Sequence, residues 1–320
     1  MPVRPSSYTA PPGLDGGHRQ TLYASLLRRV DFEYDRRERL DTPDGDFLDL
    51  DWAGAGPGSS ERVVILTHGL EGSAGRGYMR GMARAFVRRG WDACALNLRG
   101  CSGAPNRQVA TYHSGKTDDL ALVVDHVLAR GYTSLSLVGF SLGGNLTLKY
   151  LGERGGAVDP RIRGAVALSA PVDLSASADR IDRWTNWHYV QYFLRSLRRK
   201  MRVKARQHPD RVSTRPLQKV RTLRGFDDAY TAPLHGFESA TDYYRQASSR
   251  PLLSDLTVPT LLLNAANDPF LPPSCYPRTI ARAHRPLTLE VPESGGHVGF
   301  VAFNDRGEYW SERRTTSFLS

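Results

Sequence analysis

One pentapeptide constrains the fold of this chain more than any other stretch. The sequence GFSLG, residues 139–143, follows a short apolar run and leads directly into a helical pattern. Glycines on both sides of a serine allow a turn between strand and helix that is too sharp for residues with a β-carbon, and such a turn exposes the serine hydroxyl at the carboxyl edge of a sheet. The pattern predicts a nucleophile elbow at Ser141. The alternative is an ordinary helix start with Ser141 as N-cap.

The central part of the chain alternates between strand and helix patterns. Such alternation is typical of an α/β fold, in which a mostly parallel central sheet has helices on both faces. Strands are predicted at residues 62–67, 91–97, 133–139, 163–169, 259–265 and 286–291. Helices are predicted between them at 78–89, 116–130, 142–153 and 274–283.

The first sixty residues do not follow this alternation. Residues 1–30 are predicted to form an irregular N-terminal leader with a short helical pattern. Two strand-like segments, 30–40 and 47–52, flank the turn sequence TPDG and predict a hairpin. Glycine and serine then fill residues 53–60.

A second departure covers residues 172–250, which contain helical patterns and no strand pattern. We expect a helical lid inserted into an α/β core that comprises residues 31–171 and 251–320.

One segment of this insertion is a basic amphipathic helix by its pattern. We expect its apolar stripe to pack on the body and its charges to be solvated, and the alternative is a weak contact of the basic helix with an anionic membrane surface. The stripe comprises Trp187, Val190, Leu194, Leu197 and Met201, and the basic residues are Arg195, Arg198, Arg199, Lys200, Arg202, Lys204 and Arg206.

Composition is typical of a globular protein. The 320 residues, of which 40% are hydrophobic and 24% charged, suffice for one domain with an insertion. No apolar run has the length of a membrane span, and the N-terminus lacks the apolar core of a signal peptide, so we expect a cytoplasmic protein. Cys94, Cys101 and Cys275 have no metal-ligand spacing, and their odd number favours reduced thiols over a disulfide framework.

The formal net charge of +10 permits binding to nucleic acid or anionic lipid. Most of the excess is arginine, whose abundance also follows from a GC-rich genome, so we interpret it as a solvated surface. No zinc-finger or RNP-type motif is present, and we expect no nucleic-acid partner.

A serine hydroxyl needs a base to take its proton and an acid to orient that base. Asp268 follows a predicted strand in the sequence NAANDPF, and His297 follows the next one in the glycine-rich sequence ESGGHVG. Loops at the carboxyl ends of parallel strands meet at one edge of the sheet. We therefore predict a catalytic triad of Ser141, Asp268 and His297, with Asp173, which follows an earlier strand, as the alternative acid.

Two backbone N–H groups are predicted to form the oxyanion hole for the tetrahedral intermediate. One belongs to Leu142, directly after the nucleophile, and the other to Leu70, in the loop after the first parallel strand. The sequence contains neither a phosphate-binding glycine motif nor a metal-binding motif, so we expect no cofactor and no metal.

Three further residues are candidates for the wall of the substrate pocket: His68, Cys101 and His235. His68 immediately precedes the predicted oxyanion loop, and we assign it to building that loop rather than to proton transfer. For the loop that contains Cys101, the alternative is a structural role in which Arg99 ties neighbouring backbone together.

These motifs together resemble the YheT-like branch of the α/β-hydrolase superfamily, which also contains medium-chain fatty-acid ethyl ester synthase/esterases. One small departure is Asn267, where relatives often have a second aspartate before the acid. The likeness runs from about residue 17 to residue 300 and rests on HRQT (18–21), PDGDF (43–47), HGLEGS (68–73), RGCSG (99–103), YHSG (112–115), GFSLGGN (139–145), FDD (226–228), DPF (268–270) and GGHVGF (295–300).

The resemblance implies an α/β-hydrolase fold and a carboxylester hydrolase that uses Ser141, Asp268 and His297, and in some relatives the acyl group passes to an alcohol. We expect a cofactor-free serine esterase for small-molecule esters of short- to medium-chain acids. The alternatives are a thioesterase or amidase of the same fold, and a non-catalytic lipid- or membrane-surface-binding protein on a hydrolase scaffold. The oligomeric state stays open.

Overall fold

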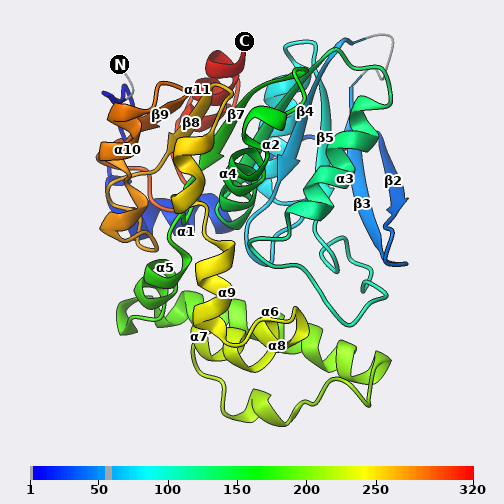
Figure 1. Cartoon of the computed structure of the whole chain (residues 1–320). Coiled ribbons are helices and arrows are strands. Elements are labelled where there is room, and N and C mark those ends of the chain that lie inside the picture. Colours follow the sequence, from blue (N-terminus) through cyan, green and yellow to red (C-terminus); the bar gives the residue numbers. More distant parts are fainter. Residues whose placement is uncertain (1–2, 55–59) are drawn as a thin grey trace.

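In the described residues, 3–54 and 60–320 of the computed structural model, a nine-stranded sheet forms the centre of the molecule. Most of the predicted glycine- and serine-rich stretch at 53–60 lies outside these residues. Along the sheet the strand order is β1-β9-β8-β7-β6-β4-β5-β3-β2 (Figure 1). Neighbouring strands are parallel except where β3 pairs with β2 and with β5. The strands are β1 (Val3–Arg4), β2 (Arg36–Asp41), β3 (Phe47–Ala53), β4 (Arg62–Thr67), β5 (Asp92–Asn97), β6 (Ser134–Phe140), β7 (Ile162–Leu168), β8 (Thr260–Leu263) and β9 (Leu287–Glu290).

Helices cover both faces of the sheet, and five of the described helices lie in the insertion below it (Figure 1). The α-helices are α1 (Gly17–Leu26), α2 (Gly77–Val87), α3 (Thr117–Leu128), α4 (Leu142–Arg154), α5 (Leu174–Ile181), α6 (Trp187–Gln207), α7 (Leu223–Phe226), α8 (Ala232–Leu234), α9 (Ala240–Ala247), α10 (Arg278–Ala283) and α11 (Trp310–Leu319). Short 3-10 turns are η1 (Gly155–Ala157), η2 (Trp184–Asn186), η3 (Arg215–Gln218), η5 (Arg250–Asp255) and η6 (Pro273–Cys275), and η4 (Asp227–Thr231) is a π-helical turn.

The α/β prediction is confirmed, and all six predicted core strands are present with ends shifted by at most two residues. The predicted hairpin is also present, but its first strand begins at Arg36 and not at residue 30. Two elements were not indicated by the sequence patterns: β1 in the leader, which pairs with β9, and the C-terminal helix α11. β1 contains only two residues, which is too short for a recognisable strand pattern, so it can be identified only from its pairing with β9.

The sheet is buried on both faces because its strands are apolar at consecutive positions. In β4, Val63 and Ile65 face the side of α3 and α4, while Val64 and Leu66 face the side of α2 and α11. All four side chains are fully buried. β4 and β6 are buried along most of their length and lie in the middle of the sheet, away from its edges.

The amphipathic helix in the insertion is α6, and four of its five predicted stripe residues are buried. Trp187 is the exception, because it lies at the first turn of the helix and is 63% exposed. The prediction that the basic residues are solvated is wrong for Lys204. Its ammonium group donates to the backbone oxygens of Asn106 and Gln108, and burial lowers its pKa to about 8.

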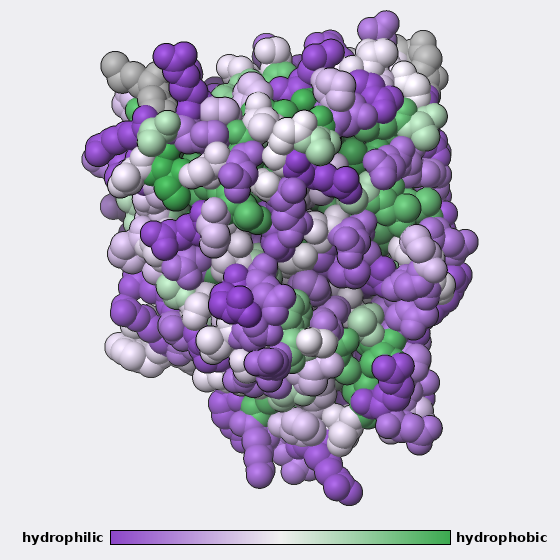
Figure 2. Space-filling view, viewed as in Figure 1, coloured by the Kyte–Doolittle hydropathy of each residue, from purple (hydrophilic) through white to green (hydrophobic). Residues whose placement is uncertain are grey.

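The face of the molecule seen in Figure 2 is mostly hydrophilic, with apolar side chains in small groups. Among the described helices, none is both long and apolar enough to span a bilayer.

A buried arginine links the hairpin turn to α3. The guanidinium of Arg99, which is 3% exposed, donates two hydrogen bonds to Asp119 at 2.8 and 2.7 Å and one to Asp44 at 2.6 Å. It also lies 3.3 Å from the fully buried carboxylate of Asp46. Arg99 therefore has the structural role that was the alternative interpretation of its loop. Its guanidinium binds carboxylates, however, and not the neighbouring backbone that the sequence suggested.

Replacement of Arg99 by alanine is predicted to lower the free energy of unfolding by about 3–5 kcal/mol, because the carboxylates of Asp46 and Asp119 lose their buried counter-charge. Urea denaturation followed by circular dichroism measures this change. The exposed Arg245, paired with Asp242 on α9, provides the control, and R245A is expected to leave the urea midpoint nearly unchanged.

The defect of R99A also depends on pH. Burial by itself raises the pKa of Asp44, but hydrogen bonds from Arg99 and Thr42 outweigh it and lower that pKa to about 2. The contribution of the Asp44–Arg99 pair to stability is thus present above the unfolded pKa of about 4 and is lost as the pH falls toward 2. The difference between wild type and R99A is expected to shrink over that range, and a constant difference would contradict this account.

Candidate active site

The turn between β6 and α4 holds Ser141 in a strained backbone conformation, with φ of 52° and ψ of −119°. Close packing explains the glycines that flank it. A Cβ on Gly139 would lie 2.2 Å from the backbone oxygen of Gly143, and a Cβ on Gly143 would lie 2.3 Å from that of Thr67. The glycines give the backbone room, while the positive φ falls on the serine itself.

The structure brings Ser141, His297 and Asp268 together in a chain of hydrogen bonds. His297 Nε2 lies 2.8 Å from Ser141 Oγ, and His297 Nδ1 lies 2.9 Å from Asp268 Oδ2. The Asp268 side chain has no exposed surface, and its other carboxylate oxygen accepts the N–H of Phe270 at 2.9 Å. Because the Asp268 carboxylate accepts from Nδ1, the lone pair of Nε2 faces the serine hydroxyl, which is the arrangement of a general base.

The alternative acid, Asp173, does not enter this chain. It is the N-cap of α5, and its carboxylate accepts the N–H of Ala176 at 3.2 Å. Asp173 therefore has a structural role at the start of the insertion.

The leader holds the loop that carries His297. Thr21 Oγ1, in α1, accepts the N–H of His297 at 2.9 Å and donates to the backbone oxygen of Gly17 at 2.7 Å. A Cβ on Gly17 would lie 1.9 Å from the backbone oxygen of Asn267, so α1 also touches the acid loop. Sequence reasoning missed Thr21 as a site residue, and its only signal was the HRQT motif of the resemblance.

Asn267 joins the acid and histidine loops to the leader. Its side-chain oxygen accepts the N–H of Gly296 at 2.9 Å, and its side-chain nitrogen donates to the backbone oxygen of Asp15 at 2.7 Å. A carboxylate has no donor for the second bond. Asn267 can therefore make both bonds, whereas the aspartate that relatives often have at this position could make only the first.

Ser141 opens into a cavity of about 120 Å³ between the core and the insertion. Both predicted oxyanion residues, Leu70 and Leu142, line it. Leu142 is the first residue of α4, so its N–H has no partner within the helix. Most of the wall is apolar, with the side chains of Leu174, Leu197, Met201, Leu223 and Phe226 coming from the insertion.

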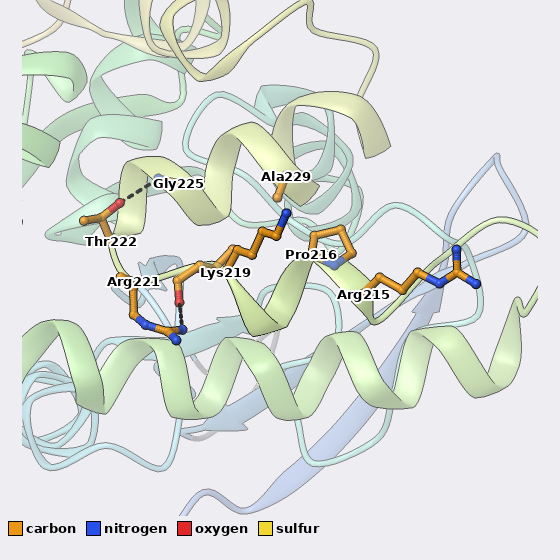
Figure 3. A pocket seen from close by; sticks show the side chains of 8 residues that line it. Arg215, Pro216, Lys219, Arg221, Thr222, Gly225 and Ala229 are labelled. Atoms are coloured by element: carbon orange, nitrogen blue, oxygen red, sulfur yellow. Dashed lines mark hydrogen bonds between the residues drawn. The ribbon is translucent and has the colours of Figure 1, made fainter.

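A larger and more open hollow, of about 550 Å³, lies on the insertion and shares no lining residue with the Ser141 cavity. Figure 3 shows the side chains of Arg215 and Lys219 beside it. The guanidinium of Arg221 donates to backbone oxygens of its own segment at 2.8 and 3.1 Å. This hollow is therefore a basic surface depression apart from the triad.

The sequence profile of the α/β hydrolase fold family matches residues 62–302. The chain belongs to this family. Its similarity to YheT of Escherichia coli (strain K12), whose name marks it as a candidate esterase, places it in the YheT-like branch: the two are 34% identical over 96% of this chain and 91% of YheT. It is also 30% identical to the monoacylglycerol lipase of Saccharomyces cerevisiae, over 89% of this chain and 63% of that protein.

Solved structures show the same fold. A Pyrococcus furiosus esterase, Pf2001, superposes with a TM-score of 0.59 at 18% identity, over 90% of this α/β-hydrolase chain and 91% of the esterase. The predicted fold class and family are thus confirmed, and ester hydrolases are prominent among the relatives. Among the described residues no group of histidine, cysteine, aspartate or glutamate has the arrangement of a metal site.

The three candidate pocket residues do not line the Ser141 cavity. His68 is fully buried, with Nδ1 2.8 Å from the Gly69 oxygen and Nε2 accepting the N–H of Leu98 at 3.1 Å. Burial lowers its pKa to about 4, so it stays neutral and can accept. His68 fits the loop-building role assigned to it, but its placement in the pocket wall was wrong.

Cys101 and His235 lie one layer behind the wall. Cys101 Sγ accepts a hydrogen bond from Lys200 at 3.0 Å, and His235 packs against His113 with ring centroids 4.6 Å apart. Lys200 and His113, and not the predicted residues, reach the cavity. Residues near His68 and His235, such as Leu70 and Thr231, line the cavity, whereas no residue of the loop 99–103 does.

A buried ion pair connects α6 to the predicted oxyanion loop. Glu71, next to Leu70, has a positive φ of 53°. Its carboxylate accepts hydrogen bonds from Tyr112 at 2.8 Å, Lys200 at 2.7 Å and Ser196 at 2.5 Å. The Glu71 side chain is only 1% exposed, so its charge depends on Lys200. The prediction of a solvated Lys200 was wrong, because periodicity does not reveal a carboxylate about 130 residues away.

Replacement of Thr21 by valine is predicted to lower the free energy of unfolding by about 1–3 kcal/mol, because the part-buried N–H of His297 loses its acceptor. Labelling of Ser141 by a fluorophosphonate probe should slow as well, since the His297 loop is less well held. T21S retains the hydroxyl and is the matched control. Equal urea midpoints for T21V and T21S would contradict the role of this hydroxyl.

The Glu71–Lys200 pair is tested by a double-mutant cycle. K200M alone is predicted to cost about 3–5 kcal/mol of unfolding free energy, because it leaves the Glu71 carboxylate buried and unpaired. The double variant E71Q/K200M is expected to be more stable than K200M, since it removes both charges. Additive effects of the two substitutions in urea denaturation would show that the groups do not interact.

Proposed function

We propose that this protein is a serine carboxylester hydrolase for esters of short- to medium-chain acids. The observation that carries the proposal is the hydrogen-bond chain from Ser141 through His297 to Asp268 at the end of an apolar cavity. Esterase and lipase names among the relatives support the reaction class.

Acylation begins when His297 Nε2 takes the proton of Ser141 Oγ, which then attacks the carbonyl carbon of the ester. The N–H groups of Leu70 and Leu142 hold the oxyanion of the tetrahedral intermediate. Asp268 keeps the imidazole in the required tautomer and stabilises its positive charge. The imidazolium then gives its proton to the leaving alcohol, and an acyl-enzyme remains on Ser141.

Deacylation repeats these steps with water as the nucleophile, activated by His297. An alcohol that enters instead of water takes the acyl group, so acyl transfer to alcohols uses the same residues. The cavity volume of about 120 Å³ and its apolar wall favour a short or medium acyl chain. The helical insertion supplies most of this wall and acts as the lid of the pocket.

A thioesterase or amidase of the same fold would use the same triad, so rates on matched ester, thioester and amide substrates discriminate between them. The non-catalytic alternative is disfavoured by the assembled triad, because a protein without this chemistry has no need to align three side chains over 2.8 and 2.9 Å contacts.

Substitution of Ser141 by alanine is predicted to lower kcat on p-nitrophenyl esters by about 10⁶-fold, because no other group in the cavity replaces the alkoxide. D268N is predicted to lower kcat by about 10⁴-fold, since an amide favours the wrong imidazole tautomer. Rates on p-nitrophenyl esters of graded chain length, together with fluorophosphonate labelling and mass spectrometry of the modified peptide, measure both effects.

The matched control for D268N is D173N, which changes the alternative acid and preserves an N-cap on α5. We expect D173N to remain within a few-fold of wild type. A large loss of kcat in D173N, together with an active D268N, would show that Asp173 is the acid of the triad. Undiminished turnover by S141A would show that Ser141 is not the nucleophile.

A further inference from the structure

The large apolar side chains that are exposed occur on only three segments of the described chain. These segments are α1, the stretch from η2 into α6, and the loop before α11. Trp184 and Leu26 are the most exposed, at 83% and 72%. We call the set the α1–α6 surface, and it comprises Leu22, Leu26, Leu27, Trp184, Trp187, Tyr192 and Phe303.

Contacts between the segments make this one surface. His18 of α1 lies 3.3 Å from the hydroxyl of Tyr189 on α6 and stacks on its ring. Tyr23 of α1 packs edge-on against Phe303, with ring centroids 5.9 Å apart. α1, which carries the exposed leucines, therefore contacts both the aromatic start of α6 and the Phe303 loop.

The surface borders the candidate active site. Thr21 of α1 holds the backbone of His297, as described above. From the side of α6, Tyr189 packs on Phe270 at 4.8 Å, and Phe270 packs on the imidazole of His297 at 4.4 Å, both between ring centroids. A molecule bound on the α1–α6 surface would thus lie beside the loops that carry the acid and the base.

Charge on α6 continues the same surface. The helix contains no aspartate or glutamate, and its exposed basic side chains are Arg195, Arg199, Arg202 and Arg206. They follow Trp187 along the outward side of the helix, whereas the ammonium groups of Lys200 and Lys204 are bonded on its inner side.

On α1, the exposed Arg19 has the carboxylate of Asp15 nearby, at 3.9 Å. Exposed tryptophan beside a row of arginines, on a helix without acidic residues, matches the headgroup region of an anionic bilayer.

We propose that the α1–α6 surface docks on an anionic phospholipid interface, with Trp184, Trp187 and Leu26 at the boundary of headgroups and acyl chains. The arginines of α6 contact lipid phosphates, and the active site takes ester-bearing lipid from that interface. The delivery of substrate rests on the proposed hydrolase function, but the docking does not. A second copy of the chain fits this surface less well, because it would bring two rows of arginine together.

The tryptophans provide an internal reporter. Trp52, Trp91 and Trp310 are buried, so a change in emission on binding reports Trp184 and Trp187. The probes are vesicles of phosphatidylcholine alone and of phosphatidylcholine with phosphatidylglycerol, and the protein is S141A, so that lipid is not consumed. We expect a blue shift and quenching by brominated lipid on the anionic vesicles. An unchanged spectrum with both kinds of vesicle would overturn the proposal.

Sedimentation with vesicles then separates apolar from electrostatic contributions. W184S/W187S is expected to weaken binding to anionic vesicles at least tenfold, and R195Q/R199Q to weaken it and reduce its salt dependence. The control R215Q/K219Q removes two exposed charges from the hollow of Figure 3 and should bind as S141A does. Equal losses in the control and in R195Q/R199Q would contradict docking by this surface.

Two further measurements complete the test. In sedimentation velocity, a dimer that W184S/W187S abolishes would assign the surface to a second copy and overturn lipid docking. With active protein, W184S/W187S is expected to retain wild-type turnover of a water-soluble p-nitrophenyl ester and to lose turnover of vesicle-borne ester. If the protein binds vesicles but hydrolyses neither substrate, the docking proposal is supported and the proposed hydrolase function is contradicted.

Discussion

The positive φ of Ser141 is the constraint on which the rest of the molecule depends. It lets β6 turn into α4 within one residue, and this turn is tolerated only because Gly139 and Gly143 leave room for backbone atoms little more than 2 Å from where a Cβ would stand. The strain is offset by burial of α4 from Leu142 to Gly152, which ties the turn to the core. The Ser141 hydroxyl therefore has a fixed position, and the base and the acid of the triad must be placed relative to it by the loops that carry them.

Those groups come from segments far apart in the chain. Asp268 and His297 follow β8 and β9, while Thr21 and Asn267 fasten their loops to the leader. The leader is therefore part of the site and not an appendage to the fold. Its helix α1 has weak amphipathic character and several exposed leucines, so its place is fixed by a few polar contacts with the two loops rather than by a large apolar interface.

Local patterns sufficed for the parts of the fold that are themselves local. Apolar runs, turn residues and the GFSLG sequence predicted the core strands, the elbow and the family. They did not predict β1, which is defined by pairing across the whole chain, or the inward direction of Lys200 and Lys204, whose partners lie about 100 or more residues away. In the same way, His113 rather than His235 reaches the cavity, because side-chain direction in a loop depends on contacts that no short pattern encodes.

The lysines and the exposed arginines of α6 lie on opposite sides of the helix and have different partners. Lysines at positions 200 and 204, four residues apart, face inward, where a compact ammonium group bonds to Glu71 and to backbone oxygens. Four arginines, at positions 195, 199, 202 and 206, occupy the outward positions, where a planar guanidinium suits phosphate. The inner side of the helix thus touches the loop that carries Leu70, while its outer side faces solvent. Any partner that shifts α6 from outside would therefore act through Lys200 and Glu71 on the backbone next to the nucleophile.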